Sequence, residues 1–389
     1  VQTCALPIYS VLVLEPNGSG HDSLLFIHPR SPRENSDEFY RNRQHGEFWI
    51  GRRMTMEETE FAYEISVRHI NDLDSFLTNR RETVTLRGED SFIDSAIEKS
   101  ESDADLVVWL SEARLIKDAF EIEELQRAVD ATHRGFEDMI RVIPGAVGKK
   151  RGERLIEGAF FTRARFEGND IGYGSIIASG SHACILHWIQ NDGELKDGEL
   201  ILIDAGVEVE SLYTADITRT IPINGKFTPA QRKIYTLVYE AQEAGIAAVK
   251  PGAKFRDFHF AAMRVLAEGL HEMGVLPVSV DEAMRPDSAV YRRWTVHGTG
   301  HMLGMDVHDC ARARNEAYAE GILEEGMVLT VEPGFYIHPD DMLFPAEYRG
   351  IGVRIEDDIL VTKDGAKNLS GAMPRHPDEI EAWASALWR

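Results

Sequence analysis

The sequence predicts an α+β protein of two domains, a small α/β domain over 1–110 and a larger α+β domain over 111–389. The chain has 389 residues, more than a single hydrophobic core normally organises. Segments with the apolar spacing of helices and short apolar runs typical of strands follow one another without a regular alternation. This order is typical of mixed α+β domains. The composition changes near residues 111–118, where a long amphipathic segment begins, so we place the domain boundary there.

The first domain is expected to contain strands over 9–14 and 23–27, two apolar runs on either side of the turn sequence PNGSG. The apolar run DLVVWL at 105–110 predicts a further strand. The stretch from Val1 to Ile8 has neither the charged nor the apolar region of a signal peptide, and its first residue is not Met. We therefore expect the front of this domain, with any targeting signal, to be missing from the sequence.

Helices in the second domain are predicted from spacing and end signals. The segment 112–143 has apolar residues at helical spacing and is expected to end at Pro144. Thr228 and Pro229 are typical of an N-cap and a first helical position, for a helix that ends at Lys250. The remaining elements are a helix over about 255–273 and strands over 173–179, 199–204, 216–222, 327–332 and 351–361.

Composition and charge exclude several classes of partner. The net charge of −23 repels polyanions, so neither nucleic acid nor an anionic membrane surface is expected to bind. No apolar run approaches the ~20 residues of a membrane span. Three cysteines without a CxxC pair indicate a reducing compartment, and we expect a cytoplasmic protein.

Four carboxylates lie in or beside apolar strand runs, where an unpaired charge is costly. Asp204 ends the run LILI, and Asp216 opens the β-branched run DITRTI. Glu332 ends the run MVLTV, and Glu356 lies within GIGVRIEDDIL. One carboxylate at a strand end is usually a turn former, but four together favour a shared metal site.

The spacing of these residues is compatible with one site. Asp204 and Asp216 are separated by a segment that allows a hairpin, which would return both carboxylates to one point. Arg354 and Glu356 are two positions apart and share a face of an extended strand. Arg354 is therefore expected either to pair with a site carboxylate or to be a surface cation on an edge strand.

The segment VHGTGHMLGMDVHD contains His297, His301 and His308. The spacing of His297 and His301 would suit one face of a helix, but the glycines around them argue against a helix. Glycines beside histidines instead fit a close approach of the backbone to a ligand. A lone histidine is usually structural, whereas three in so short a segment favour a functional site.

An oxygen-rich ligand set with few histidines suits Mn²⁺ and also permits Zn²⁺, Co²⁺ or Fe²⁺. Several carboxylates around few histidines also suggest two bridged ions, about 3.5–4 Å apart, that activate a shared water for hydrolysis. Other chemistries lack support, because the sequence has no GxSxG motif or P-loop, and GYG at 172–174 is too short for a nucleotide loop.

The segments LIDAG, YTADITRTIPINGKFTPAQRKIY, HGTGHMLGMDVHD, VLTVEPGFYI and GIGVRIEDDI resemble the metal-site motifs of metallopeptidases with the pita-bread (creatinase/aminopeptidase) fold. The resemblance covers about 112–389, and 9–110 is similar, more weakly, to the back part of the N-terminal domain of aminopeptidase P. It implies a pita-bread catalytic domain preceded by a truncated α/β domain. It also implies the activity of a dinuclear-metal Xaa-Pro aminopeptidase, which releases the residue before a proline.

The resemblance further implies roles for individual residues. Asp204 would be a terminal metal ligand, Asp216 and Glu356 would be bridging ligands, and His301 and Glu332 would each bind one metal. Glu332 would also relay protons from the bridging water. The other catalytic residues would be His187, which contacts the substrate, His297 and His308, which stabilise the tetrahedral intermediate, and Tyr336 and Arg354, which orient Asp204.

Two alternatives remain open. A prolidase, which cleaves only dipeptides, has nearly the same motifs, and Arg292, Arg293 or Arg354 would serve it as a clamp for the substrate carboxylate. A non-catalytic pita-bread binding module is a more distant alternative, since such proteins typically lose the ligand residues that this chain keeps. The expected partners are peptides with an Xaa-Pro N-terminus and further copies of the chain, as a dimer or tetramer.

Overall fold

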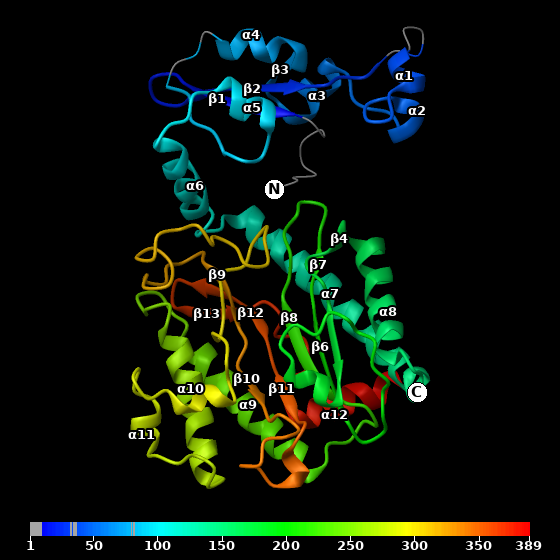
Figure 1. Ribbon diagram of the computed structural model, residues 1–389, viewed down its shortest axis with the longest axis vertical. Coiled ribbons are helices and arrows are strands. Elements are labelled where there is room, and N and C mark those ends of the chain that lie inside the picture. Colours follow the sequence, from blue (N-terminus) through cyan, green and yellow to red (C-terminus); the bar gives the residue numbers. More distant parts are fainter. Residues whose placement is uncertain (1–9, 32, 34–36, 79, 81) are drawn as a thin grey trace. The chain divides into compact units, whose positions relative to one another are not determined.

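The computed structural model describes residues 10–31, 33, 37–78, 80 and 82–389 (Figure 1). Within that part of the chain, no helix is both long and apolar enough to cross a membrane. The contacts divide the chain into two compact units, Val1–Val107 and Val108–Arg389. Each unit has a hydrophobic core of its own.

The first unit contains a three-stranded sheet of order β1-β2-β3. β1 (Val11–Pro16) and β2 (His21–Ile27) confirm the two strands predicted around the turn and pair in antiparallel, and β3 (Ser66–His69) pairs with β2 in parallel. Of the strand expected over 9–14, Tyr9 lies outside the described residues. The helices of this unit are α1 (Asp37–Arg41), α2 (Glu47–Ile50), α3 (Met56–Tyr63), α4 (Leu73–Thr78) and α5 (Ser91–Ala96).

The strand expected at 105–110 is wrong, because these residues lie in helix α6 (Ser102–Ala113). The acidic residues Asp103 and Asp105 occupy its first turn, where a negative charge interacts favourably with the helix dipole. The carboxylate of Asp103 also accepts hydrogen bonds from the backbone N–H groups of Ser100 and Thr85. These contacts fix the start of a helix that the apolar run alone does not predict.

Helix α7 (Ala119–Ala146) begins and ends later than the predicted segment 112–143. Asp118 caps it through a capping box with Glu121. The break expected at Pro144 is wrong, because Pro144 lies inside the last turn. Pro144 has no N–H to offer the carbonyl of Ile140, and this oxygen instead accepts a 2.7 Å hydrogen bond from the indole of Trp388.

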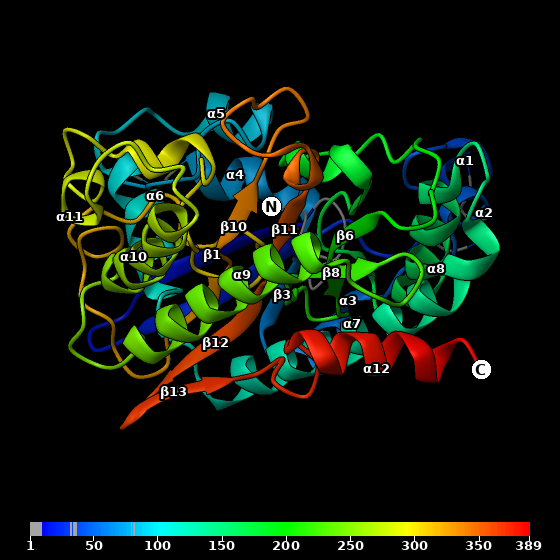
Figure 2. The same ribbon diagram turned by 90° about the horizontal axis from the view of Figure 1, so that it is seen from below.

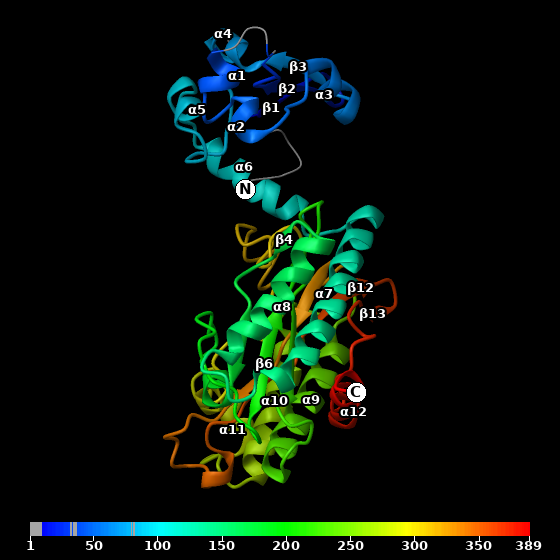
Figure 3. The ribbon, with the colours of Figure 1, turned by 90° about the vertical axis from the view of Figure 1, so that its right-hand side faces the viewer.

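Two helix pairs cover the strands of the second unit (Figure 3). α8 (Gly152–Glu167) packs on α7, and this pair contacts β4, β5 and β7. α9 (Pro229–Ala248) packs on α10 (Asp257–Glu272), and α9 contacts β9, β10 and β11. The start of α9 is confirmed by a capping box at Thr228. α12 (Pro377–Leu387), red in Figure 2, contacts both α7 and α9, and the short helix α11 (Val280–Ala283) contacts α10.

The strands of the second unit form several small sheets. The first has the order β5-β6-β8 and contains β5 (Ile176–Ser179), β6 (Leu200–Ala205) and β8 (Ile217–Pro222). The second has the order β13-β12-β9 and contains β9 (Val328–Val331), β12 (Asp357–Thr362) and β13 (Gly365–Asn368). Two further pairs are β10 (Gly334–Tyr336) with β11 (Gly352–Arg354) and β4 (Asp170–Ile171) with β7 (Val207–Glu208).

The single strand expected over 351–361 is divided in two. β11 ends at Arg354 and β12 begins at Asp357, so Glu356 lies at the junction of two sheets. Its backbone N–H donates to the carbonyl of Thr218 in β8 at 3.1 Å. The shared strand face expected for Arg354 and Glu356 is therefore replaced by a break that both sheets hold in place.

Candidate metal centre

The ends of two sheets bring the predicted carboxylates together. β6 and β8 are antiparallel neighbours, so the predicted hairpin is confirmed and returns Asp216 to the vicinity of Asp204. β9 and β12 are also antiparallel, which places Glu332, after β9, beside Glu356, before β12. Asp204, Asp216 and Glu356 are buried, and Glu332 is nearly so.

Ligand atoms of Asp216, His301 and Glu356 lie within 4.8 Å of one another. The Nε2 atom of His301 is 3.3 Å from Oδ2 of Asp216 and 3.6 Å from Oε1 of Glu332. Burial lowers the pKa of His301, but the hydrogen bond with Asp216 and the charge of Glu332 outweigh it and raise this pKa to about 9. His301 is therefore surrounded by acidic groups, and it lies outside any helix, as its glycine neighbours predict.

The hydroxyl of Tyr173 connects Asp204 to this group. It lies 2.6 Å from Oδ1 of Asp204 and 2.5 Å from Oδ1 of Asp216. Gly172 permits this position, because a Cβ atom there would lie 1.9 Å from Oγ1 of Thr214. The structure thus assembles all the residues predicted as ligands, together with a tyrosine that the sequence did not reveal.

Burial and mutual repulsion disfavour the charged forms of Glu332 and Glu356. Burial raises the pKa of Glu332 to about 7, against the opposing charges of His301 and Arg354. Burial, and then the charge of Asp216, raise the pKa of Glu356 well above its ordinary value. Arg354 and His301 balance part of this negative charge. Divalent cations would balance the remaining negative charge, and carboxylate oxygens and imidazole nitrogens are ligands that such cations prefer.

Arg354 forms the pairing that the sequence analysis expected, with a site carboxylate. Its Nη2 atom lies 2.5 Å from Oδ2 of Asp204, and both side chains are buried. Its Nη1 atom donates to the hydroxyl of Tyr336 at 3.0 Å, and its Nε atom donates to Thr218 at 3.1 Å. His297 extends the chain of contacts, with Nε2 at 2.8 Å from the same tyrosine hydroxyl. Arg354 is not a surface cation.

The other two predicted catalytic histidines lie at the exposed side of the centre. His308 is exposed, and its ring stacks edge-on against His301 with centroids 4.3 Å apart. His187 is also exposed and lies in the turn between β5 and β6. Burial lowers the pKa of His297 and of His308, and the charge of His187 adds to the lowering of both, which indicates that His187 lies near these two rings.

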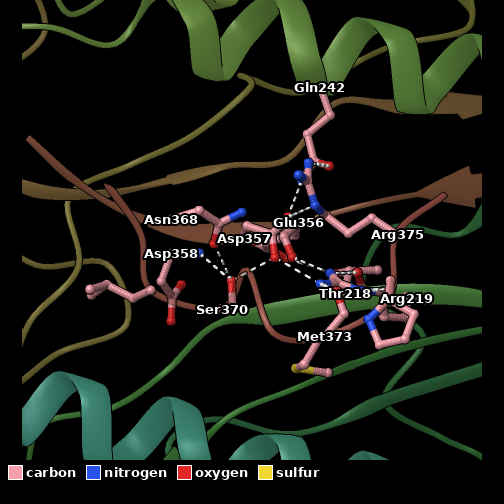
Figure 4. Close-up of polar contacts among 12 residues, drawn as sticks. Thr218, Arg219, Gln242, Glu356, Asp357, Asp358, Asn368, Ser370, Met373 and Arg375 are labelled. Carbon is pink, nitrogen blue, oxygen red and sulfur yellow. Dashed lines mark hydrogen bonds and ion pairs between the residues drawn. The ribbon is translucent and has the colours of Figure 1, made fainter. Parts of the chain in front are cut away.

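A buried network lies behind Glu356 (Figure 4). Arg219 pairs with Asp357 at 2.7 Å and donates to the backbone carbonyl of Glu356 at 2.6 Å. Asp357 also accepts hydrogen bonds from Gln242 at 2.9 Å and from Ser370 at 2.6 Å. The backbone on both sides of Glu356 is therefore fixed by groups that satisfy one another.

Asp358, the next residue on β12, points to the opposite face of the strand. Its carboxylate accepts the backbone N–H of Asp216 at 3.2 and 3.3 Å. The hydroxyl of Thr218 donates to Oε2 of Glu356 at 2.6 Å. Both carboxylates that are expected to bridge are thus oriented by neighbouring groups, as metal ligands commonly are.

Three further residues orient the centre but were not predicted from the sequence, since each contacts a partner that is distant along the chain. Tyr173 and Asp358 belong to this group, and so does His259 of α10. The Nδ1 atom of His259 lies 2.7 Å from Oγ1 of Thr299. The backbone carbonyl of Thr299 in turn accepts the backbone N–H of Glu332. The only available signal was local: Tyr173 lies between two glycines, and Asp358 follows Glu356 in an apolar strand.

The mixed α+β fold and the carboxylate–histidine centre define a hydrolase of the metallopeptidase class. Residues 122–363 match metallopeptidase family M24, and the chain belongs to this family. The family implies that the centre holds divalent metal ions, in agreement with its donor set.

Two relatives within this family are Xaa-Pro aminopeptidases. Xaa-Pro aminopeptidase 1 of Streptomyces coelicolor is 56% identical over 381 residues, which are 97% of this chain and 76% of the relative. The Xaa-Pro aminopeptidase of Escherichia coli is 38% identical over 362 residues, which are 86% of this chain and 79% of the relative.

Solved structures give the same result for the fold. The aminopeptidase PepP of Pseudomonas aeruginosa has a TM-score of 0.85 and 33% identity, covering 97% of this chain and 86% of its own. Aminopeptidase P from E. coli in its low-pH form has a TM-score of 0.84 and 34% identity, covering 97% and 86%. The predicted resemblance to aminopeptidase P and the pita-bread fold are confirmed.

Proposed function

We propose that the chain is a metal-dependent aminopeptidase that releases the N-terminal residue from peptides with proline at the second position. The observation that carries this proposal is the convergence of Asp204, Asp216, His301, Glu332 and Glu356. The identity with Xaa-Pro aminopeptidases supports the substrate class. A non-catalytic binding module is not favoured, because such a module has no need to keep this costly set of buried carboxylates.

The centre is proposed to hold two divalent ions. Carboxylate oxygens outnumber imidazole nitrogens among its ligands, which favours Mn²⁺ and permits Zn²⁺, Co²⁺ or Fe²⁺. When bound, the ions would act as Lewis acids on the scissile carbonyl and would activate a water as the nucleophile.

The side chains of the protein bind the substrate and move protons. The negative carboxylate cluster attracts the free N-terminal amine of a peptide. Glu332 would carry the proton released by the nucleophilic water toward the leaving proline nitrogen, and its Oε2 atom lies 3.5 Å from Nδ1 of His297. His308 and His187, at the exposed side, are placed to donate hydrogen bonds to the substrate.

The test is a comparison of a tripeptide Xaa-Pro-Yaa with the dipeptide Xaa-Pro on the metal-loaded protein. We expect the tripeptide to be cleaved after Xaa with a kcat/KM at least comparable to that of the dipeptide. Mass spectrometry of the products should show free Xaa and Pro-Yaa. Cleavage of the dipeptide alone, with longer peptides neither cut nor inhibitory, would identify a prolidase instead.

The arginines that a prolidase would use are partly engaged. Arg354 is held by Asp204 and Tyr336, and Arg293 pairs with Asp341 at 3.2 Å. A dipeptidase needs a free cation to bind the proline carboxylate, and two of the three candidates already have acidic or phenolic partners. Arg292 remains as a candidate clamp, so the preference for the aminopeptidase rests on the identity with Xaa-Pro aminopeptidases.

The proposal extends to location, assembly and domain layout. The free thiols of Cys184 and Cys310 support a reducing, cytoplasmic compartment. We propose a homo-oligomer, dimer or tetramer, with domains over 1–110 and 111–389 and without nucleic acid or membrane partners. Light scattering of the purified protein would measure its oligomeric state directly.

A further inference from the structure

The carboxylate of Glu153, on helix α8, lies outside the metal centre and is fully buried. Its Oε1 atom accepts the backbone N–H and the hydroxyl of Ser179, at 2.8 and 2.7 Å, and lies 2.9 Å from Nδ1 of His182. Its Oε2 atom accepts the indole N–H of Trp188 at 2.8 Å and the backbone N–H of Gly193 at 2.7 Å. One carboxylate therefore binds donors from four points of a single segment, 179–193.

The same helix holds this segment at another point. Asn191, which is fully buried, donates to Glu157 at 2.8 Å and to the carbonyl of Ser175 at 2.9 Å, and accepts the N–H of Ile177 at 2.9 Å. Asn191 has a φ of 47°, a left-handed conformation that costs free energy unless its surroundings impose it. Consecutive turns of α8 thus anchor the returning arm of the segment.

The segment 179–193 packs so closely against Glu153 that its side chains have little room to move. A Cβ atom at Gly193 would lie 2.6 Å from Oε1 of Glu153 and 2.7 Å from the ring of His182. The rings of His182 and Trp188 stack with centroids 3.9 Å apart and an interplanar angle of 25°. Trp188 is therefore fixed on its ring face by His182 and at its N–H by Glu153.

His187 immediately precedes Trp188 and is one of the exposed members of this segment. Because the indole of Trp188 is held from two directions, the backbone of its neighbour cannot shift without breaking a hydrogen bond to a buried carboxylate. Loss of such a bond leaves a buried group unsatisfied and is costly. The position of His187 at the side of the metal centre is therefore set by a residue that does not reach the centre itself.

We propose that Glu153 is a positioning residue for His187, and that the segment 179–193 is a preformed wall of the substrate site. The inference rests on the proposed function, in which His187 contacts the substrate. Glu153 holds the wall through Trp188, His182 and Ser179, so that the imidazole of His187 meets the substrate without a reordering step. Small misplacements of such a group reduce rates by as much as ~10²-fold.

The test is a double-mutant cycle with Glu153→Gln, His187→Ala and the combined variant, on an Xaa-Pro-Yaa peptide. We expect Glu153→Gln to lower kcat/KM by roughly 10- to 100-fold while bound metal, measured by elemental analysis, stays unchanged. In the His187→Ala background the same substitution should have little further effect, because the residue through which it acts is absent. Equal effects of Glu153→Gln in both backgrounds, or a loss of metal, would overturn the proposal.

The matched control is Glu167→Gln on the same helix, which removes a carboxylate paired with Arg134 and Arg163 far along α8 from this segment. It should leave kcat/KM unchanged. If Glu153→Gln does not fold, Trp188→Phe replaces it, since phenylalanine keeps an aromatic ring against His182 and lacks the indole N–H donor. Its loss of kcat/KM should likewise vanish in the His187→Ala background, and a loss that persists there counts against the proposal. Absence of cleavage by the wild-type protein would instead contradict the proposed function.

Discussion

Arg354 and Asp204 lie 150 positions apart in the sequence and form a buried contact of 2.5 Å. The guanidinium also holds the hydroxyl of Tyr336, so one cation orients a carboxylate and a phenol at the same time. Guanidinium groups suit this task because their planar donors have fixed directions. The contact turns Asp204 toward the centre and compensates part of its charge.

Replacement of Arg354 by Met should destabilise the metal-free protein strongly. The change leaves Asp204 as a buried carboxylate without its cation, a loss that typically costs about 3–5 kcal/mol. Tyr336→Phe is the matched control, since it removes one hydroxyl contact of the same arginine and should cost about 1 kcal/mol. Urea unfolding in the presence of a chelator measures both. Equal effects of the two substitutions would show that the ion pair contributes little.

Glu356→Gln should lower the metal content of the purified protein by at least one ion per chain. An amide keeps the contact with Thr218 but cannot supply the charge that two neighbouring cations need from a bridging ligand. Elemental analysis after dialysis measures the content. Glu347→Gln, at an exposed position, is the control and should keep full occupancy. Full metal content and activity in Glu356→Gln would remove this residue from the bridging role.

Removal of the metal should lower the stability of the protein, and its return should restore it. The carboxylates repel one another without cations, and ligand binding stabilises the native state by about 2.7 kcal/mol at a concentration of 100 Kd. Thermal unfolding with a chelator and then with increasing Mn²⁺ should show a Tm that rises with concentration. Glu356→Gln should show a smaller rise, while its metal-free form is at least as stable as the metal-free wild type. A Tm insensitive to divalent ions would contradict a resident metal centre.

The His308→Ala variant should keep its metal content, and its kcat should fall. A hydrogen-bond donor aimed at the oxygen that becomes negative contributes about 2.7–4 kcal/mol, or roughly 10²–10³ in rate. Steady-state kinetics on an Xaa-Pro peptide, with elemental analysis of the same sample, separate the two effects. The exposed His338 provides the control as His338→Ala, which should retain wild-type kcat. A wild-type kcat in the His308 variant would leave this residue with a structural role only.

The stabilisation that Glu153 provides should depend on pH. Burial raises its pKa, but the hydrogen bonds from Trp188, His182 and Ser179 outweigh burial and lower the pKa below its ordinary value of 4.5. A carboxylate whose pKa is depressed by folding stabilises the native state above pH 4.5, and this contribution disappears as the pH falls through the folded-state pKa. The difference in unfolding free energy between wild type and Glu153→Gln, about 1.5–3 kcal/mol, should be constant near neutrality and shrink in acid. A difference that grows as the pH falls would contradict this assignment.

Local patterns in the sequence were sufficient for the parts of the fold that depend on neighbours along the chain. The Thr228 cap, the hairpin of β6 and β8 and the helix-free histidine segment follow from short-range geometry, and the structure confirms each. The carboxylates at Asp204 and Glu332 stood out because charge is costly at the end of an apolar strand.

The remaining features depend on residues distant in sequence. The run at 105–110 is helical because of acidic and capping contacts around Asp103, which outweigh its strand propensity. Pro144 stays helical because Trp388 satisfies the carbonyl that proline leaves free. Glu153 carries no local signal, and Tyr173 shows only its two flanking glycines, since the partners of both come from other elements of the fold.

The contacts between β8 and the start of β12 also determine when the centre can form. Thr218 meets Glu356 across 138 positions, and Asp216 meets Asp358 across 142. A ribosome adds roughly 5–20 residues per second, so the first carboxylates leave it on the order of ten seconds before the last. During this interval β6 and β8 exist without the strand that completes their site. The full set of proposed ligands is therefore available only after Glu356 has been synthesised, late in the synthesis of the chain.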